Sequence, residues 1–506
     1  MPEQDSFPLH LYNSISRKKE VFEPLNPPFV GLYVCGPTVY GDPHLGHARA
    51  AVTFDVIFRY LKYLGYNVRY VRNITDVGHL ENEVSEDGED KIAKKARLEQ
   101  IEPMEVVQTY TIHYHNGMDA LNCLRPSIEP TASGHIIEQI ELVKKILENG
   151  FAYEVNGNVY FDLEAYRKTN SYGELSGKVL EDLQAGSRQT EGMDEKRGPH
   201  DFALWKRANP GHIMRWNSPW GEGFPGWHLE CTTMSTKYLG GKFDIHGGGL
   251  DLQFPHHEAE IAQCRSAHGH DPVKYWLHNN MVTIDGAKMS KSAGNFINLQ
   301  QLFEGDHELL EKPFSPMAVR FLMLQSHYRS KIDFSNDALV AAEKGYHRLM
   351  AAIDLLKNME TPAKESSGDK DAEILKACER CHESMSDDFN TAQVLAALFD
   401  LAAKINALHN GQIGKDEISG AAFTTMSETI HDFVFDVLGL KPESASDNSR
   451  TEELVNLLIE IRARAREQKD FATSDKIRDD LQRIGIQLKD DKSGSTSFEI
   501  YDSQPA

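Results

Sequence analysis

The chain has 506 residues, 40% of them hydrophobic and 26% charged, which is enough for several domains and a large core. Its formal net charge of −22 excludes a uniformly basic nucleic-acid-binding surface, although a local basic track could still contact RNA. Six cysteines are too few for a disulfide framework, and because neither a secretory signal nor a run of about 20 apolar residues is visible, we expect a cytoplasmic protein without membrane contact.

The first predicted unit is a buried strand over Phe29–Val34, followed by a Gly/Pro-rich loop and a helix. We expect Asp42 to cap this helix and Pro43 to be its first residue. His44 and His47 then share one helical face close to the N-terminus. Free N–H groups and the positive end of the helix dipole favour a polyphosphate there, and two imidazoles can donate further hydrogen bonds to it.

Three separate segments carry candidate metal ligands. Cys35 follows the first strand, and Cys231 ends the segment that begins at Gly226. His256 and Glu260 are four residues apart and point the same way if a helix begins at Pro255, as we expect. Two thiolates, an imidazole and a carboxylate are a possible zinc set.

Spacing alone leaves other interpretations open in this region. His257 could replace His256 as a ligand, and Cys264 lies one turn further along the same helical face. A buried cysteine beside surface histidines would need no metal at all. Gly247-Gly248-Gly249 follows a strand expected to end at His246. We interpret this run as a close backbone approach to a nucleotide, with a generic flexible turn as the alternative.

A second short motif lies in a loop between Asp285-Gly286 and Gly294-Asn295, and it consists of Lys288-Met289-Ser290-Lys291-Ser292. Two ammonium groups on such a loop can close over a triphosphate and stabilise the leaving pyrophosphate. A solvated basic loop is the alternative when this motif is taken alone. Its occurrence together with the histidine pair favours the activation of a carboxylate by ATP.

The order of elements predicts an α/β fold with a Rossmann-type parallel sheet that is split by an insertion. An α-helical bundle and a small C-terminal domain follow. The expected boundaries are 1–121 and 201–274 for the two halves of the nucleotide-binding domain, 122–200 for the insertion, 275–335 for a linking region with the lysine loop, 336–440 for the bundle, 441–451 for a linker and 452–506 for the last domain.

The last domain begins with an apolar stripe on a predicted helix, formed by Leu454, Leu457, Leu458 and Ile461. Basic residues and one aromatic residue surround the stripe: Arg462, Arg464, Arg466, Lys469, Phe471, Lys476 and Arg478. Such a surface could hold exposed RNA bases by charge and stacking. Acidic residues are interleaved, and a solvated amphipathic helix would show the same pattern.

Taken together, the two short motifs resemble the His-x-Gly-His and Lys-Met-Ser-Lys-Ser signatures of the class I aminoacyl-tRNA synthetases. The segments around the candidate ligands are similar to the cysteinyl-tRNA synthetases in particular, and the likeness extends along almost the entire chain. The similar segments are Cys-Gly-Pro-Thr-Val-Tyr from Cys35, Pro-Gly-Trp-His-x-Glu-Cys up to Cys231, and the stretch from Phe243 to Glu260. This resemblance implies that the zinc ligands are Cys35, Cys231, His256 and Glu260.

The resemblance also implies a two-step reaction with three substrates, ATP as its Mg²⁺ complex, L-cysteine and tRNA(Cys). Cysteinyl-adenylate forms first, and the cysteinyl group then esterifies the 3'-terminal adenosine. The implied catalytic residues are His44, His47, Lys288 and Lys291, the ATP site adds Gly46 and Ser290, and the cysteine pocket has Thr75, Trp227, His246 and Asp251. For Trp227 alone, simple core packing is the alternative.

The resemblance implies one Zn²⁺ per chain, which would bind the thiolate of cysteine and reject the harder, less acidic hydroxyl of serine. It also implies that residues 452–506 bind the anticodon, and we expect a monomer. A rival interpretation is a cysteine ligase that passes the same adenylate to an amino-sugar. The segment from Glu452 onward argues against that rival, because such relatives lack an anticodon-binding tail.

Overall fold

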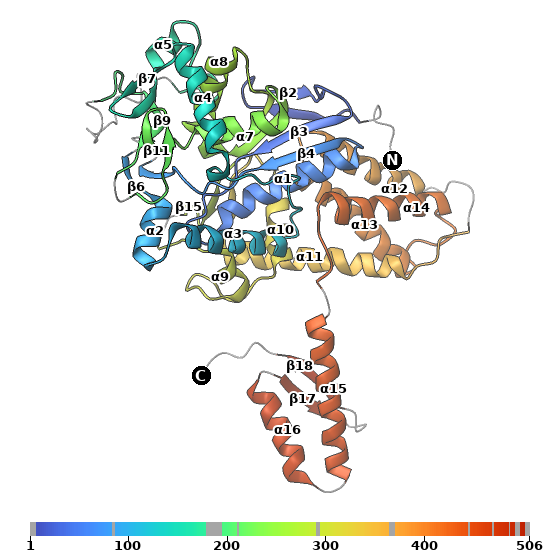
Figure 1. Cartoon of the computed structure of the whole chain (residues 1–506). Helices are drawn as coiled ribbons and strands as arrows, with labels where there is room; N and C mark the ends of the chain where they lie inside the picture. The colour runs from blue at the N-terminus through green and yellow to red at the C-terminus, as the bar shows by residue number, and fades with distance from the viewer. Residues whose placement is uncertain are drawn as a thin grey trace. The chain divides into compact units, whose positions relative to one another are not determined.

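The computed structural model describes residues 7–82, 87–178, 195–209, 212–289, 294–363, 370–443, 446–467, 470–484, 486–490 and 496–500. The predicted functional residues Ser290 and Lys291, and the basic residue Lys469, lie outside this described part. The chain divides into two compact units, residues 1–441 and 442–506, each with its own secondary structure (Figure 1).

Four parallel strands form a sheet in the first unit. Their order in the sheet is β13 (Val273–Asn279), β12 (Phe243–Gly249), β3 (Phe29–Val34) and β4 (Asn67–Arg72). All three pairings are parallel, so the predicted parallel sheet is confirmed. Alternate residues of β3 face opposite ways: Leu32 packs with α1 (Leu45–Tyr63), and Tyr33 packs beside Met234 of α7 (Leu229–Leu239). The two helices therefore cover opposite faces of the sheet (Figure 1).

The glycine run lies inside a strand and not in the predicted loop after it. Gly247, Gly248 and Gly249 pair with the last three residues of β13. A Cβ on Gly247 would lie 2.1 Å from the Phe54 ring of α1, and one on Gly248 would lie 2.8 Å from the His257 ring. The prediction that the strand ends at His246 was therefore wrong. Protein side chains fill the space beside Gly247 and Gly248, whereas Gly249 lines a cavity.

Shorter elements surround the parallel sheet. The N-terminal hairpin is attached to the edge strand β13, since Trp276 donates its backbone N–H to Asn13 Oδ1 at 3.0 Å. The elements before the insertion are β1 (His10–Asn13), β2 (Lys18–Val21), β5 (Leu80–Asn82), β6 (Asp87–Asp90), α2 (Lys91–Glu99) and α3 (Pro103–Ala120). The 3₁₀ turn η1 (Ser133–His135) lies within the predicted insertion.

The insertion forms a second, antiparallel sheet in the order β10-β11-β9-β8-β7, next to α4 (Ile136–Glu148) and α5 (Leu163–Arg167). Its strands are β7 (Ala152–Val155), β8 (Asn158–Phe161), β9 (Phe202–Arg207), β10 (Trp216–Ser218) and β11 (Gly221–Pro225). Three of these strands lie beyond residue 200, where the sequence analysis placed the end of the insertion. Four consecutive residues of β9 are buried, and such a run is typical of a parallel-sheet strand as well.

A linking region and a helical bundle complete the first unit, and the helical pattern expected over 336–440 is confirmed. The linking region contains the sheet β15-β14-β16, whose strands are Ala287–Lys288, Val282–Ile284 and Ile332–Phe334, with α9 (Leu299–Glu304) and α10 (Pro316–Leu324). The bundle consists of α11 (Asn336–Lys357), α12 (Asp371–Ser386), α13 (Thr391–His409), α14 (Gly420–His431) and the short π-helix η4 (Asp432–Val437).

Within the described residues, α13 is the one helix with the length and apolar composition of a membrane span. Its residues Val394, Leu398, Leu401 and Ile405 are buried in the core of the bundle. The apolar character of this helix is therefore explained by its packing among the other helices of the bundle.

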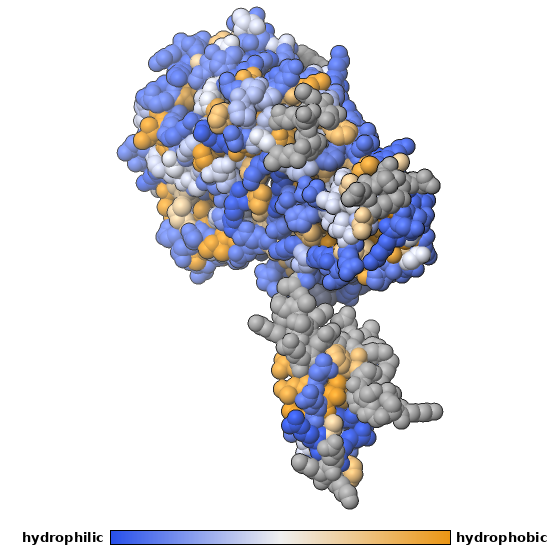
Figure 2. Space-filling view, turned by 90° about the vertical axis from the view of Figure 1, so that its right-hand side faces the viewer, coloured by the Kyte–Doolittle hydropathy of each residue, from blue (hydrophilic) through white to orange (hydrophobic). Residues whose placement is uncertain are grey.

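The second unit packs two helices against a hairpin. Its elements are α15 (Ser446–Glu467), which begins inside the expected linker, α16 (Phe471–Arg483), β17 (Ile486–Asp490) and β18 (Thr496–Ile500). Val455, Leu481 and Ile486 form its core. Leu454, Leu457 and Ile461 of the predicted stripe are instead 60%, 52% and 41% exposed, and apolar residues show at this unit's surface (Figure 2). The predicted helix is present, and Leu458, the remaining residue of the stripe, packs against this core, so α15 divides the stripe between its core and its surface.

Candidate active site

A cavity of ≈ 490 Å³ lies at the carboxyl ends of the parallel strands, where open α/β sheets bind their ligands. The structure brings most of the predicted residues into its lining: Cys35, His44, Gly46, His47, Thr75, Trp227, Cys231, Asp251 and His256. His246 and Glu260 lie behind this lining, where His246 Nε2 is 2.9 Å from Glu260 Oε2 and both side chains are buried.

The two signature histidines cap the helix α1 themselves. His44 is the N-cap: its Nδ1 accepts from Gly46 N–H at 3.0 Å, and its own N–H donates to His47 Nδ1 at 3.3 Å. The predictions that Asp42 is the cap and that the helix begins at Pro43 were wrong, because the Asp42 carboxylate instead lies 2.7 Å from His113 Nδ1.

This reciprocal capping sets the chemistry of the pair. The rings of His44 and His47 stack with centroids 3.9 Å apart. Since each Nδ1 accepts a backbone N–H, the proton of each neutral ring is on Nε2, which makes Nε2 the donor. Burial lowers the pKa of His47 to about 4, so this ring is neutral at physiological pH. His47 can therefore donate a hydrogen bond to a phosphate oxygen without carrying a full charge, and His44 presents its Nε2 beside it.

Four donor atoms from three segments meet at one point beside the cavity, and all but that of Cys35 belong to buried residues. Cys35 Sγ, after β3, lies 3.5 Å from Cys231 Sγ on α7 and 3.8 Å from Glu260 Oε1 on α8 (His256–His268). His256 Nε2 lies 3.4 Å from both Cys231 Sγ and Glu260 Oε1. A tetrahedral zinc site with bonds of about 2.0–2.3 Å has ligand-to-ligand edges of about 3.3–3.8 Å, so these residues fit the ion.

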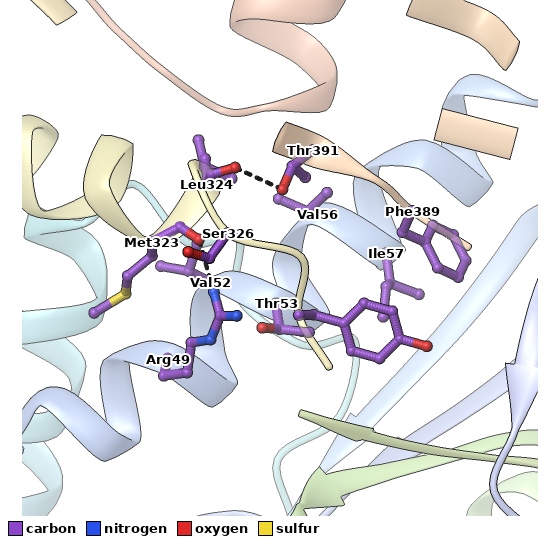
Figure 3. Close-up of a pocket in the computed structure, with 11 residues that line it drawn as sticks. Arg49, Val52, Thr53, Val56, Ile57, Met323, Leu324, Ser326, Phe389 and Thr391 are labelled. Atoms are coloured by element: carbon purple, nitrogen blue, oxygen red, sulfur yellow. Dashed lines mark hydrogen bonds between the residues drawn. The ribbon is translucent and has the colours of Figure 1, made fainter. Parts of the chain in front are cut away.

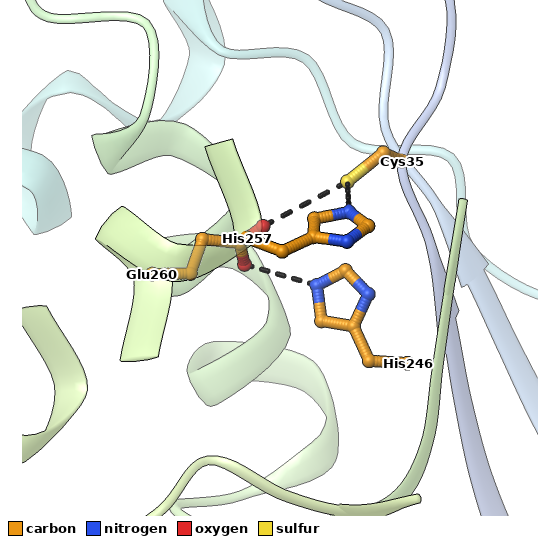
Figure 4. A group of neighbouring side chains, drawn as sticks. All are labelled: Cys35, His246, His257 and Glu260. Carbon is orange, nitrogen blue, oxygen red and sulfur yellow. Dashed lines mark hydrogen bonds and ion pairs between the residues drawn. The ribbon is translucent and has the colours of Figure 1, made fainter. Parts of the chain in front are cut away.

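A second group of possible metal ligands overlaps the first and includes the alternative ligand His257. Cys35 Sγ lies 3.3 Å from His257 Nε2, and His246 and Glu260 complete the group (Figure 4). Neither His246 nor His257 lines the cavity, whereas Cys231 and His256 do. Three residues of the first group line the cavity, compared with Cys35 alone in the second, so an ion held by the first group would be the more open to a ligand there. Among the described residues, Cys264 belongs to neither group.

Burial controls the protonation of the donor set. It raises the pKa of the Cys35 thiol to about 12 and that of the Cys231 thiol well above its usual value. It also lowers the pKa of His256 well below the usual range. The protein alone thus keeps the thiols protonated, and a divalent cation would reverse that preference.

A family model described as the class I (C) tRNA synthetase catalytic domain matches residues 21–344. A DALR domain model matches 380–440, and the cysteinyl-tRNA ligase anticodon binding domain matches 450–496. The cysteine–tRNA ligase of Porphyromonas gingivalis is 57% identical over 491 residues, which cover 96% of this chain and 98% of that protein. The corresponding ligase of Bacteroides fragilis is 58% identical with the same coverage. The chain belongs to the cysteine–tRNA ligase family.

Solved structures show the same fold at low sequence identity. Methionyl-tRNA synthetase of Mycobacterium tuberculosis in complex with methionyl-adenylate has a TM-score of 0.56 at 15% identity, and covers 85% of this chain and 94% of its own. Arginyl-tRNA synthetase of Thermus thermophilus has a TM-score of 0.52 at 15% identity, with 85% and 84% covered. The fold of this cysteine–tRNA ligase family member is therefore that of the class I synthetases.

Four further residues around the predicted cysteine pocket were missed by the sequence analysis. Thr38 Oγ1 lies 2.6 Å from His79 Nδ1, and Lys91 Nζ lies 2.8 Å from His79 Nε2. The His79 ring stacks on the indole of Trp227 with centroids 4.2 Å apart. Buried Glu230 accepts a 2.7 Å hydrogen bond from Thr75 Oγ1, and it precedes Cys231 in a segment that was already singled out. No spacing signal joins His79 and Lys91, because the β5–β6 hairpin separates them in sequence.

The lysine loop begins at the same cavity. Lys288 ends β15, where it pairs with Thr283 of β14, and Met289 after it lines the cavity. In this member of the cysteine–tRNA ligase family, the start of the lysine loop and the histidine pair therefore border the same cavity.

Proposed function

We propose that the cavity catalyses the ligation of L-cysteine to tRNA(Cys) in two steps. First, a carboxylate oxygen of cysteine attacks the α-phosphorus of ATP, which gives cysteinyl-adenylate and pyrophosphate. Second, a ribose hydroxyl of the 3'-terminal adenosine attacks the carbonyl carbon, and AMP leaves. The observation that carries this proposal is the pair of cysteine thiols that opens into the same cavity as the stacked histidines. The anticodon-domain match over 450–496 disfavours an amino-sugar acceptor.

The side chains of the chain have distinct parts in the first step. His44 and His47 donate from Nε2 to phosphate oxygens as negative charge develops there, and Gly46 leaves room for the stacked rings. Lys288, Ser290 and Lys291 are proposed to bind the departing pyrophosphate, which leaves as the complex with Mg²⁺. No covalent intermediate with the protein is required.

Cysteine selection is proposed for a pocket next to the candidate metal ligands. Cys35, Cys231, His256 and Glu260 would hold one Zn²⁺, and the bound ion would supply a soft cation that ligates a thiolate far better than a hydroxyl. Trp227 lies 4.6 Å from the His256 ring and covers this point. Thr75 and Asp251 are proposed to orient the rest of the substrate, and His246 orients Glu260 through the bond between them.

Pyrophosphate exchange together with metal analysis tests the whole proposal. We expect the purified protein to contain one Zn²⁺ per chain and to catalyse ATP–pyrophosphate exchange with cysteine at least about 10⁴-fold better than with serine. An active preparation without stoichiometric metal would refute the role of zinc. We also propose a cytoplasmic monomer, and sedimentation at micromolar concentration measures its oligomeric state.

Two adjacent histidines give a matched test of the ligand set. His256→Gln is expected to abolish stoichiometric zinc binding, because it removes a donor atom from the group that opens into the cavity. His257→Gln is expected to keep the metal, because the first group does not use its imidazole. If His257→Gln loses the zinc and His256→Gln retains it, the second group is the metal site.

A further inference from the structure

A second cavity of ≈ 400 Å³ adjoins the candidate active site. The wall between the two is the 3₁₀ turn η2 (Leu250–Gln253): Asp251 and Leu252 line the first cavity, and Leu250 and Gln253 line the second. Asn280 lines both cavities. Only the turn η2 separates the two cavities, so a ligand that extends out of the active site past this turn reaches the second cavity.

The second cavity is cationic in an acidic chain. The chain has a formal net charge of −22, yet two arginines, Arg17 and Arg329, are in the lining of this cavity and none of its described lining residues is Asp or Glu. The polar groups between the arginines are neutral and include Tyr12, Ser14 and Gln253. This arrangement favours an anionic ligand with further hydrogen-bonding groups.

Arg329 is fixed in place by a buried carboxylate. Its Nε donates to Asp388 Oδ2 at 2.7 Å, and its guanidinium lies over the Tyr12 ring at 4.2 Å. Asp388 is fully buried and also accepts from Tyr12 N–H and Tyr328 Oη–H, both at 2.8 Å. Asp388 and the Tyr12 ring therefore fix the guanidinium of Arg329 at the cavity. A guanidinium held in this way can still bind a phosphate through its remaining N–H groups.

The backbone around Asp388 supports this positioning. Asp388 and Phe389 have φ values of 62° and 54°, which is the left-handed region that non-glycine residues rarely adopt. Such a conformation persists only where its surroundings hold it, and here the hydrogen bonds to the Asp388 carboxylate do so.

Arg17 supplies the second charge from the turn between β1 and β2. It approaches the insertion so closely that a Cβ on Gly177 would lie 2.2 Å from Arg17 Nη2. Its guanidinium forms no ion pair or side-chain hydrogen bond with the part of the chain that the structure describes. Two arginines from distant segments thus meet at one cavity, and of the two only Arg329 has a carboxylate partner among the described residues, Asp388.

We propose that this second cavity binds a phosphodiester of the single-stranded acceptor end of the tRNA while the terminal ribose enters the active site. The proposal rests on the proposed function, since only the transfer step brings RNA to the active site. Guanidinium groups bind phosphate oxygens through two parallel hydrogen bonds, and neutral polar groups suit the attached ribose. A free nucleotide or inorganic phosphate offers the same phosphate chemistry, so the test separates these sources.

Arg17→Ala and its neighbour Lys18→Ala form a matched pair. Both are exposed cations of one hairpin, but only Arg17 lines the cavity. We expect Arg17→Ala to keep cysteine-dependent ATP–pyrophosphate exchange within about twofold of the unmodified protein. Single-turnover transfer from preformed adenylate to subsaturating tRNA should slow by about tenfold, and its dependence on log[salt] should weaken by about one unit of slope. Lys18→Ala should match the unmodified protein in both assays.

Two outcomes would overturn the proposal. If Arg17→Ala transfers cysteine as fast as Lys18→Ala does, the cavity holds no part of the RNA. If Arg17→Ala raises the KM for ATP in the exchange reaction and leaves transfer unchanged, the anion is a free nucleotide or phosphate. Failure of the proposed function is a separate result, because the unmodified protein would then show no cysteine-dependent exchange at all.

Discussion

The stacked imidazoles of His44 and His47 depend on a residue that has no side chain. Each ring is held by a backbone N–H at the start of α1, and the rings lie with their centroids 3.9 Å apart. Gly46 stands between them, where a Cβ would lie 2.9 Å from His44 Cε1. Cβ atoms essentially never approach a neighbouring atom this closely, so a side chain at this position must displace the His44 ring.

Gly46→Ala is therefore expected to lower the rate of cysteine-dependent pyrophosphate exchange by about tenfold or more, because one phosphate donor is displaced. The thermal unfolding midpoint should stay the same or rise slightly, since alanine favours a helix over glycine. The exchange rate and the unfolding midpoint are measured on the same preparation. Unchanged exchange would show that the stacked arrangement is not needed for activation.

His382 gives the protein a dependence of stability on pH far from the active site. It lies on α12, stacked on Phe7 and Tyr63, with its edge toward Phe433. Burial lowers its pKa to about 4, whereas an unfolded histidine has a pKa of about 6.5. Between these values the unfolded state binds more protons, so the stability from this residue is present above pH 6.5 and is lost as the pH falls toward 4.

His382→Phe is expected to remove this contribution. Between pH 6.5 and pH 5, the free energy of unfolding of the variant should fall by about 2 kcal/mol less than that of the unmodified protein. Urea unfolding at a series of pH values measures the difference. Identical pH profiles for the two proteins would contradict a neutral, buried imidazole at this position.

At the scale of elements, the helix α1 is fastened to the linking region by Arg49. This side chain donates from Nη1 to the Met323 carbonyl at 2.7 Å and from Nη2 to the His327 carbonyl at 2.8 Å. It follows His47 by two residues, and Figure 3 shows it reaching from α1 toward the end of α10. The position of the phosphate-binding end of α1 therefore depends on a segment almost 300 residues away in the chain.

Arg49→Met keeps most of the side-chain length but removes both donors. We expect the free energy of unfolding to fall by about 2–4 kcal/mol, because buried carbonyls lose their partners. The exchange rate should fall with it, while the KM for cysteine stays the same because the candidate metal ligands lie on other elements. Arg49→Lys, which retains a single donor nitrogen, should lie between Arg49→Met and the unmodified protein in stability and in exchange rate. A variant with unchanged stability and activity would show that this connection is dispensable.

Sequence periodicity predicted those elements that have one apolar and one polar face. It did not predict features that depend on which other element packs against them. The parallel strands β3 and β12 were recoverable because alternating strands and helices constrain the topology. The extension of β12 through its glycines was not recoverable, because it depends on Phe54 and His257 approaching from other elements. Which face of α15 is buried likewise depends on where α16 and the hairpin pack. Val455 is buried against them, whereas the longer Leu454 is exposed.

The candidate site shows the same division. Short motifs located Cys35, Cys231 and the histidine pair, since the chemistry needs those residue types in fixed local contexts. The residues that orient them come from elsewhere: His79 stacks on Trp227, and His228 Nδ1 lies 3.0 Å from His256 Nδ1. Such contacts form only when the chain folds, and no local sequence pattern predicts them.

At the scale of the whole molecule, both proposed chemical steps belong to the first unit. The two cavities, the candidate metal ligands and the histidine pair all lie within residues 1–441. The second unit, residues 442–506, has its own small core of Val455, Leu481 and Ile486. The two units should therefore be separable in function, with both chemical steps and the acceptor end of the tRNA in the first and recognition of the anticodon in the second.

A chain that ends at Lys441 tests this separation. We expect it to fold, to bind one Zn²⁺ and to catalyse cysteine-dependent exchange within about twofold of the full chain, because no core residue of the first unit is removed. Its KM for tRNA should rise by about tenfold or more, since the loss of stacking with even one base is worth about 1–3 kcal/mol. Unchanged charging of tRNA would show that the second unit does not contact the RNA, and loss of exchange would show that activation requires both units.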